Sequence, residues 1–387
     1  MTAKLVPIDM AYVQDVLVRM MRTPSPTGRT DQIMQLIGEQ LTELGLHFDL
    51  TRRGVIVAEY PGESGPAGPD RTIVVHGDTI GCMVRQLKEN GRLAIVPVGT
   101  HSARFAEGAR VTIFVDDLEQ GFYTGTVLPL LASGHRYGDE VDTQGVSWEQ
   151  IEVRVDEDVQ NAADLADLGI HVGDFVALDA TPEITASGYV KGRHLDDKAG
   201  VAAALGAFKA LRDHDMSIPV NAHLLITISE EVGLGATHGV DEQVAELVSI
   251  DVAIVAPGQA STEHTVNIAM QDSSGPFDYH LARRLASLAE EHGIDHHRDV
   301  YGFYRSDTAS ALQAGAQTRA ALIGFGIDAS HGHERTHLDG IRRTAELVAV
   351  YLQTELTFPY WDASANGGLR DFPSRSVQPA DEQLPRA

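Results

Sequence analysis

Two helical patterns and one short apolar run organise the first 83 residues. Residues 9–21 and 28–44 carry apolar side chains every three or four positions, and Gly45 follows the second segment where a C-terminal cap belongs. Residues 72–75 form an apolar run of the kind found in strands that are covered on both faces. We therefore predict two helices followed by a buried strand that ends just before His76.

The pattern changes between residues 84 and 180. Short apolar runs such as RLAIVPV, RVTIFVDD and FVALDA alternate there with Gly-rich turns. Closely spaced short strands separated by turn residues are typical of all-β modules. We predict that this segment is a β-rich domain inserted into the chain.

Helical and strand patterns alternate again after residue 180. The predicted helices cover 195–213, 278–293 and 337–354, and the predicted strands cover 222–231, 251–257 and 319–327. Strands that alternate with helices indicate a largely parallel sheet covered on both faces. The predicted fold class is α/β: a mostly parallel sheet flanked by helices, with an inserted β-rich, barrel-like domain.

The same patterns divide the chain into four parts. Residues 1–83 and 181–358 are predicted to form the two parts of one α/β domain, and residues 84–180 the inserted domain. Residues 359–387 lack periodicity and are rich in Pro, Ser and Gly, so we expect a mobile tail.

The charge balance excludes several classes of partner. Lys and Arg number 30 against 55 Asp and Glu, a formal net charge of −25 in 387 residues. Such an acidic surface repels a phosphate backbone and an anionic membrane. We therefore expect neither nucleic acid nor a membrane as a partner. No run reaches about 18 apolar residues, and the N-terminus lacks the apolar core of a signal peptide.

A single cysteine, Cys82, rules out a disulfide within the chain and fits a reducing compartment. A buried structural role for Cys82 is favoured over a nucleophilic one. We expect a cytoplasmic protein.

Polar side chains follow the predicted strands at several points. His76 and Asp78 follow the first strand, and a carboxylate two residues from a histidine can orient a metal-bound imidazole. The alternative is a histidine that is simply satisfied by hydrogen bonds. In parallel sheets, sites form where strands end at their carboxyl edge, so these side chains are candidates for a shared site.

Two pairs of acidic residues strengthen this interpretation. Asp196 and Asp197 open a predicted helix. Asp is a favoured N-cap at such a position, but a carboxylate there could also bridge two cations. Glu230 and Glu231 follow the apolar run LLITI, and adjacent buried carboxylates repel each other unless a cation or proton relieves them. One of the two can bind a metal while the other moves a water proton. Solvated surface charge is the alternative.

The segment SHGHERTH (330–337) adds three histidines, His331, His333 and His337, with Glu334 among them. A surface histidine cluster is the alternative to a ligand-bearing loop. A phosphate loop at GLGATHG (233–239) is disfavoured, because this segment lacks the spacing and the Lys-Ser/Thr ending of such loops. No GxSxG nucleophile motif is present.

Taken in order, the segments HGDTIG, GIHVGDFVALD, GYVKGRHLDDKAG, ISEEVGLGA, YRSDTASAL and SHGHE resemble the tetrahedral, glutamyl-type aminopeptidases, which use two metals. The resemblance covers residues 7–355 and is closest to a subgroup linked with the osmoprotectant N-acetylglutaminylglutamine amide. It implies a zinc-exopeptidase-like fold and assembly, up to a dodecamer, through the inserted module.

The resemblance also implies residue roles by position. Glu230 would be the general base, and Asp78 would orient His76. The implied metal ligands are His76, Asp196, Glu231 and His331, with Asp196 bridging both metals and the Asp196–Asp197 peptide cis.

Two positions depart from the family pattern. Where the family carries a metal-binding aspartate, the run DVAIVAP (251–257) places Pro257, so Gln259 or Glu263 would have to substitute, or one metal would be weakly held or absent. Glu334 lies three residues after His331 rather than four, which leaves His333 as a fallback ligand.

These observations favour a metal-dependent hydrolase that cleaves amide bonds of short peptides, as aminopeptidases do. Two divalent ions are expected, with zinc suited to histidine and carboxylate ligands and cobalt or manganese also fitting. The expected partners are a short peptide substrate and further copies of the chain, with a role in osmoprotectant dipeptide metabolism. A deacylase for an N-blocked amino acid or dipeptide and a catalytically silent binding subunit are the alternatives.

Overall fold

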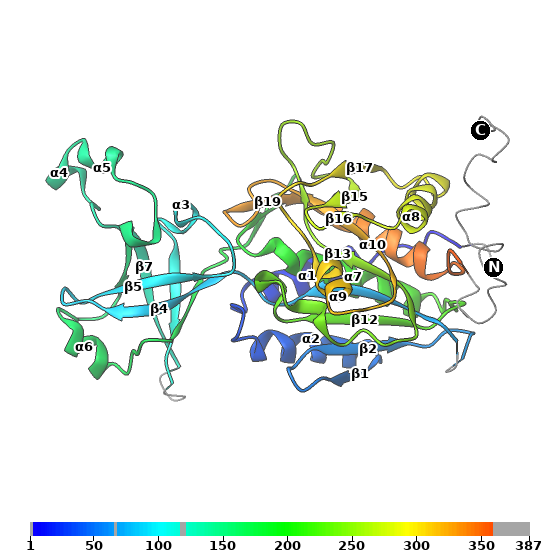
Figure 1. Ribbon diagram of the computed structural model, residues 1–387, viewed down its shortest axis with the longest axis horizontal. Helices are drawn as coiled ribbons and strands as arrows, with labels where there is room; N and C mark the ends of the chain where they lie inside the picture. The colour runs from blue at the N-terminus through cyan, green and yellow to red at the C-terminus, as the bar shows by residue number, and fades with distance from the viewer. Residues whose placement is uncertain (1–2, 66–67, 117–120, 359–387) are drawn as a thin grey trace, which may run out of the picture.

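The computed structural model describes residues 3–65, 68–116 and 121–358. Figure 1 shows two bodies side by side, a larger α/β body and a smaller β-rich body that extends from one end of it. The tail predicted at 359–387 lies outside the described residues.

A ten-stranded mixed sheet forms the centre of the larger body, with its main path in the order β1-β2-β12-β3-β13-β18-β15-β16. The strands are β1 His47–Leu50, β2 Ile56–Tyr60, β3 Asp70–His76, β12 Ala222–Thr227, β13 Val244–Ile250, β14 Ala253–Ile254, β15 Val266–Asp272, β16 Gly275–Pro276, β17 His296–Val300 and β18 Arg319–Ile327. The central four, β12, β3, β13 and β18, pair in parallel. Their carboxyl ends therefore lie along one edge of the sheet.

Helices cover both faces of this sheet (Figure 1). They are α1 Met10–Met21, α2 Asp31–Glu43, α7 Leu195–Asp213, α8 Tyr279–Glu291, α9 Asp307–Gln313 and α10 Leu338–Leu352. Alternate strand residues serve the two faces, as a strand's period of two requires. Leu224 and Ile226 join the core cluster that includes α7 and α10, whereas Leu225 joins the cluster under α9.

The smaller body is a closed six-stranded barrel in the order β4-β5-β8-β7-β6-β9. Its strands are β4 Gly81–Leu87, β5 Arg92–Val98, β6 Arg110–Phe114, β7 Phe122–Pro129, β8 Ile151–Val155 and β9 Phe175–Leu178. Short helices decorate it: α3 Ala103–Ala106, α4 Gly134–Tyr137, α5 Glu140–Thr143, α6 Ala162–Asp167 and the 3₁₀ turn η1 Trp148–Gln150. Cys82 is fully buried in the barrel core, where burial raises the pKa of its thiol, so its structural interpretation is the better one.

A third, small sheet joins segments that are far apart in the chain. It consists of β10 Glu183–Ile184, β11 Tyr189–Gly192 and β19 Glu334–His337. Its register places Gly192 opposite Glu334. The strand that leads into α7 is thereby held beside residues 330–337, which carry the three histidines.

The fold class expected from the sequence is confirmed, with antiparallel strands at the edges of the larger sheet. One predicted strand is shorter than expected, and the strand before it was not predicted. The run 251–257 contributes only the short strand β14, which pairs with β18, whereas the strand that pairs with both β3 and β18 is β13, which ends just before Asp251. The strand predicted at 222–231 ends at Thr227, and the 3₁₀ turn η2 Glu230–Val232 follows, with a second turn, η3 Gly235–Thr237.

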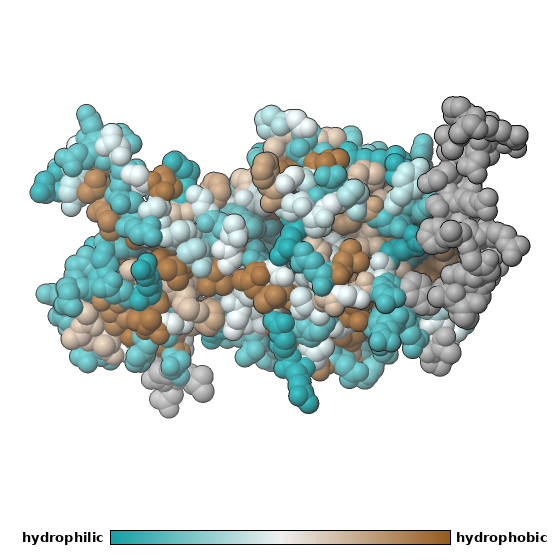
Figure 2. Space-filling view, viewed as in Figure 1, coloured by the Kyte–Doolittle hydropathy of each residue, from teal (hydrophilic) through white to brown (hydrophobic). Residues whose placement is uncertain are grey.

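Hydrophilic residues cover most of the face shown in Figure 2, with hydrophobic residues gathered over the barrel and in the middle of the view. No helix among the described residues has both the length and the apolar character needed to cross a membrane.

Candidate metal centre

His76 ends β3 with its side chain buried at the carboxyl edge of the sheet. Its Nδ1 lies 3.0 Å from the backbone carbonyl oxygen of Asp78, so an Nδ1–H donates there and Nε2 is left free. That Nε2 lies 3.1 Å from Oδ1 of Asp196. The ring is thus held by a backbone contact and presents its free nitrogen to a carboxylate.

The carboxylate of Asp78 serves neighbouring backbone rather than the imidazole. It accepts from the hydroxyl of Thr27 at 2.6 Å and from the backbone N–H groups of Glu230 and Glu231 at 3.1 and 3.4 Å. Its nearest approach to Nδ1 of His76 is 3.7 Å. Asp78 therefore ties the loop that carries the two glutamates to the end of β3.

Asp196 lies between two histidines at the start of α7. Its Oδ1 faces His76, and its Oδ2 lies 3.2 Å from Nε2 of His331. The Asp196–Asp197 peptide is cis, as the resemblance implied. One carboxylate is therefore placed to serve two sites at once.

Glu334 holds this arrangement from β19. Its carboxylate accepts from the backbone N–H groups of Leu195 at 2.7 Å, Asp196 at 3.3 Å and His331 at 2.9 Å. It is buried at the pairing of β11 with β19. A glutamate three residues after His331 therefore anchors both the aspartate and the histidine.

The two glutamates after β12 point to different partners. Oε2 of Glu231 lies 3.4 Å from Nε2 of His331, while its Oε1 accepts from the backbone of Ile80 at 3.0 Å. Oε2 of Glu230 lies 3.9 Å from Nε2 of His76. Within the described residues, the carboxylate of Glu230 accepts no hydrogen bond. Glu230 is thus the acid with the freer carboxylate.

His331, rather than His333, reaches the carboxylates. Its Nδ1 lies 2.8 Å from the carbonyl oxygen of Thr100 in the barrel, which leaves Nε2 facing Asp196 and Glu231. The Nε2 atom of His333 instead lies 3.4 Å from the hydroxyl of Thr181. His337 is engaged with the backbone of Ser187.

The alignment of the missing aspartate with Pro257 was wrong. The strand next to β3 is β13, and the residue that follows it is Asp251, buried at the same edge as His76. His76, Glu230 and Asp251 each offer a ligand atom, and these atoms lie within 4.8 Å of one another. The apolar run VAELVSI, ended by an aspartate, was the sequence signal that could have found this residue.

The expected substitutes for that aspartate lie elsewhere. The side-chain amide of Gln259 donates to the carbonyl of Val300 at 3.1 Å. Glu263 makes a two-pronged ion pair with Arg335 at 2.7 and 3.1 Å. Neither residue is needed to supply a ligand.

Burial and mutual repulsion dominate the electrostatics of the site. Burial raises the pKa of Glu231 to about 7 and that of Glu334 to about 8, and the pKa of Asp251 lies well above its ordinary value for the same reason. Burial alone would lower the pKa of His331, but the hydrogen bond with Asp196 and the charge of Glu231 raise it to about 10. A divalent cation would relieve the repulsion among so many buried carboxylates.

The donor set itself fits such cations. His76, Asp196 and Glu231 form a second group of ligand atoms within 4.8 Å, beside the group that contains Asp251. Imidazole nitrogens with carboxylate oxygens suit zinc, and also cobalt or manganese. The two groups overlap at the single free nitrogen of His76, so both lie at the same edge of the sheet.

Asp307 is another residue whose role the sequence reasoning missed. Its carboxylate accepts from the hydroxyl of Thr227 at 2.6 Å and from the backbone of Ala236 at 2.7 Å. A side chain at Gly235 would collide with it, since an added Cβ would lie 1.9 Å from its Oδ1. Asp307 thus braces the loop that carries Glu230 and Glu231.

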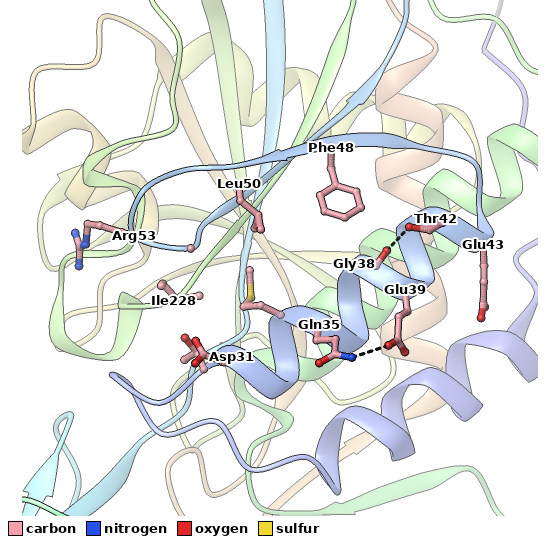
Figure 3. Close-up of a pocket in the computed structure, with 13 residues that line it drawn as sticks. Asp31, Gln35, Gly38, Glu39, Thr42, Glu43, Phe48, Leu50, Arg53 and Ile228 are labelled. Atoms are coloured by element: carbon pink, nitrogen blue, oxygen red, sulfur yellow. Dashed lines mark hydrogen bonds between the residues drawn. The ribbon is translucent and has the colours of Figure 1, made fainter. Parts of the chain in front are cut away.

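A large surface groove is separate from the carboxylates. It lies between α2 and β1 and has a volume of about 750 Å³ (Figure 3). Its lining combines the apolar residues Met34, Phe48, Leu50 and Ile228 with polar and charged residues of α2 and with Arg53. None of the candidate ligands is among the described residues that line it. The chemistry therefore belongs to the sheet edge and not to this groove.

Together the parallel sheet edge, the convergent histidines and carboxylates and the inserted barrel define an aminopeptidase-type hydrolase of the α/β fold class. The family model for M42 glutamyl aminopeptidases matches residues 54–347, and the chain belongs to this family. The Bacillus subtilis (strain 168) protein named "Putative aminopeptidase YhfE" is 37% identical over 342 residues, which cover 88% of this chain and 97% of that protein. The expected family and the expectation of an enzyme are both confirmed.

More distant relatives carry different names. A protein named glutamyl aminopeptidase from Lactococcus lactis subsp. cremoris (strain MG1363) is 24% identical over 54% of this chain and 57% of its own length. A protein named lysyl aminopeptidase from Pyrococcus furiosus is 22% identical over 62% of this chain and 66% of its own length.

Solved structures share the fold. Aminopeptidase APDkam598 from the archaeon Desulfurococcus kamchatkensis has a TM-score of 0.81 at 21% identity, covering 93% of this chain and 99% of that one. PhTET1-12s, whose structure is named as a dodecamer, has a TM-score of 0.74 at 21% identity, covering 87% and 98%. At these identities the likeness concerns the fold alone.

Proposed function

We propose that this chain is a two-metal aminopeptidase that removes residues from short peptides. The observation that carries the proposal is the position of Asp196, whose two carboxylate oxygens face His76 and His331 at 3.1 and 3.2 Å. A carboxylate between two histidines suits a bridge between two cations. Zinc is the favoured metal, and cobalt or manganese also fits.

The ligands divide between two positions. His76, Asp196 and Asp251 would hold one ion, and Asp196, Glu231 and His331 would hold the other. Backbone carbonyl oxygens, those of Asp78 behind His76 and of Thr100 behind His331, fix which ring nitrogen is free, as outer contacts do in metal sites. Asp251, buried at the same edge as His76, would supply the aspartate that Pro257 cannot, which favours the enzyme over a catalytically silent homologue.

Glu230 is the proposed general base. A divalent ion bound here would acidify water and polarise the scissile carbonyl. Glu230 would take the proton of the attacking water on its freer carboxylate and return it to the leaving amine. Asp78, through the backbone of Glu230, would keep that carboxylate in place.

Substrate and assembly extend this proposal. Relatives of the chain are named for glutamyl and for lysyl substrates, so the preferred residue would be set by side chains outside the shared site. Assembly into a homo-oligomer, up to a dodecamer, is supported by the structural neighbour that is named as a dodecamer. A cytoplasmic location stays an expectation from the sequence. The link with an osmoprotectant dipeptide, and deacylation of an N-blocked substrate, rest on the resemblance of motifs only.

The experiment compares Glu230→Gln with the parent protein after loading with zinc or cobalt. We expect unchanged metal content and a loss of dipeptide turnover of about 10²-fold or more, because a positioned base contributes that much. Near-normal turnover would remove Glu230 from its role. Free-amine and N-acetylated dipeptides, compared as substrates, separate the aminopeptidase from the deacylase.

The silent alternative has its own outcome in the same experiment. Metal content well below one ion per chain, with no hydrolysis after either metal is added, would favour a binding subunit. Glu63→Gln, an exposed glutamate far from β12 in the chain, serves as the matched control and should retain both metal and rate.

A further inference from the structure

Two polar side chains beside the candidate metal centre are buried without a partner. Nη1 of Arg193 and both ring nitrogens of His101 are inaccessible to solvent and make no hydrogen bond among the described residues. Buried polar groups are normally paired, since a missing hydrogen bond leaves the desolvation of the group uncompensated. Such groups next to a site are candidates for contact with a ligand.

Both residues are tied to the surroundings of His331. His101 directly follows Thr100, whose carbonyl oxygen accepts from Nδ1 of His331. Arg193 directly follows Gly192, which pairs with Glu334, and Glu334 accepts from the backbone of His331. A residue of the barrel and a residue of the larger body therefore lie near His331, and the charges of Arg193 and His331 both act on His101.

Packing orients the imidazole of His101, whose ring nitrogens lie near the backbone of Gly99 but make no hydrogen bond of good geometry. Its ring lies 4.9 Å from the ring of Trp148, edge to face at 79°. Burial, with the charges of His331 and Arg193, lowers the pKa of His101 to about 4. At neutral pH the ring is therefore uncharged and offers one N–H donor.

Arg193 has no ion-pair partner within the part of the chain that the structure describes. The nearby carboxylate of Glu334 already accepts three backbone N–H groups. Arg193 thus keeps donor capacity on its guanidinium beside the site, in a chain whose net charge is −25.

A guanidinium and a neutral N–H donor together match a carboxylate. Arginine presents a planar array of donors that fits carboxylate oxygens, and such charged bonds are stronger than neutral ones. We propose that Arg193 and His101 form a subsite that binds a carboxylate of the peptide substrate next to His331. The inference rests on the proposed function and assigns its substrate class: short peptides with an anionic group.

Two sources could supply this carboxylate: the C-terminus of a dipeptide or the side chain of an acidic residue. The test measures peptide binding by calorimetry to metal-loaded Glu230→Gln protein, in which turnover is suppressed. Ala-Ala against Ala-Ala amide reports the C-terminus, and Glu-Ala amide against Gln-Ala amide reports the side chain.

One of the two carboxylate peptides should bind about tenfold or more tightly than its neutral counterpart, the range of a charge-assisted pair. Arg193→Gln should abolish that difference while leaving the neutral peptide within about twofold. His101→Phe, which keeps a ring against Trp148, should reduce the difference in affinity between the carboxylate and neutral peptides. Arg305→Gln removes an equal charge beside Gly233 and should leave the difference intact.

Each result separates this inference from the proposed function. The subsite is overturned if Glu230→Gln protein binds both members of each peptide pair with equal affinity. It is also overturned if a difference in affinity persists when Arg193→Gln is added. Failure of hydrolysis in the enzyme with an intact Glu230 overturns the proposed function, while the binding comparison still reports on Arg193 and His101.

Discussion

The Nδ1 atom of His331 lies 2.8 Å from the carbonyl oxygen of Thr100. This contact joins the loop after β5 of the barrel to the turn after β18 of the larger sheet. The hydrogen bond fixes a proton on Nδ1 and leaves Nε2 to face Asp196 and Glu231. The inserted barrel thereby takes part in shaping the candidate centre.

Gly99→Ala is expected to weaken metal binding by about tenfold, the range for loss of a contact behind a metal ligand. Gly99 has φ +80°, and an added Cβ would lie 3.0 Å from Ile80 and 3.3 Å from the backbone oxygen of Glu231. The loop must then move away from His331. Metal affinity is measured by competition with a chromophoric chelator.

Gly108→Ala is the matched control for this change. Gly108 also has a left-handed backbone, φ +76°, but an added Cβ meets nothing within 4 Å. It therefore introduces comparable backbone strain without moving the loop. Equal affinity loss in both variants would show that strain, and not the Thr100 contact, is responsible.

Asp251→Asn is expected to lower the metal content by about one ion per chain, because an amide is a much poorer ligand than a carboxylate for a divalent cation. Elemental analysis of the purified variant measures this directly. Asp272→Asn alters another buried carboxylate that belongs to neither group of ligand atoms and should keep the parent content. Two ions retained by Asp251→Asn would contradict its role.

Glu231 and Glu334 are expected to lower the stability of the metal-free protein as pH rises from about 4.5 to 8, whereas His101, with its pKa lowered to about 4, acts in the opposite direction up to about pH 6.5. The pKa values of Glu231 and Glu334 are raised to about 7 and about 8, so their contribution is complete below the unfolded value and is lost as they ionise. The raised pKa of His331, about 10, acts in the same direction. Thermal unfolding after chelator treatment measures the trend.

Zinc should reverse this trend, because its ligands bind in their deprotonated forms. The rise in unfolding temperature on adding zinc is expected to be larger at pH 8 than at pH 5. Glu231→Gln removes one titrating group and should flatten the metal-free profile. A metal-free pH profile that Glu231→Gln leaves unchanged would contradict the prediction.

Tyr351→Phe is expected to destabilise the fold by about 1–3 kcal/mol. The buried hydroxyl of Tyr351 donates to Glu246 at 2.6 Å, and the fully buried Arg71 donates to the backbone carbonyls of Tyr351 and Thr354 at 2.6 and 2.8 Å. The change leaves a carboxylate oxygen of Glu246 without its donor. Urea unfolding measures the free energy, and Tyr279→Phe at an exposed position should change it by less than about 0.5 kcal/mol.

Local patterns were enough to predict much of the fold. The helical periodicities at 9–21 and 195–213 and the apolar run before His76 correspond to α1, α7 and β3. Such periodicity is set by neighbours in the chain, which is why it can be read without tertiary information. The candidate ligands at strand ends followed from the same patterns.

The choice between two apolar runs could not be made locally. VAELVSI and DVAIVAP are both strand-like, and only pairing with β3 and β18 selects the first. That selection moves the acidic candidate ligand from the position of Pro257 to Asp251. Strand order depends on long-range packing, which periodicity does not report.

The family, the α/β class and the residue types that gather at the strand ends all follow from the linear order of residues. Which of those side chains meet depends on tertiary packing. Packing selects His331 over His333, sets Asp251 beside His76, and brings Thr100 to the same histidine. The contact between Thr100 and His331 joins residues 231 positions apart, and such separations are closed by sheet pairing and barrel docking rather than by local preference.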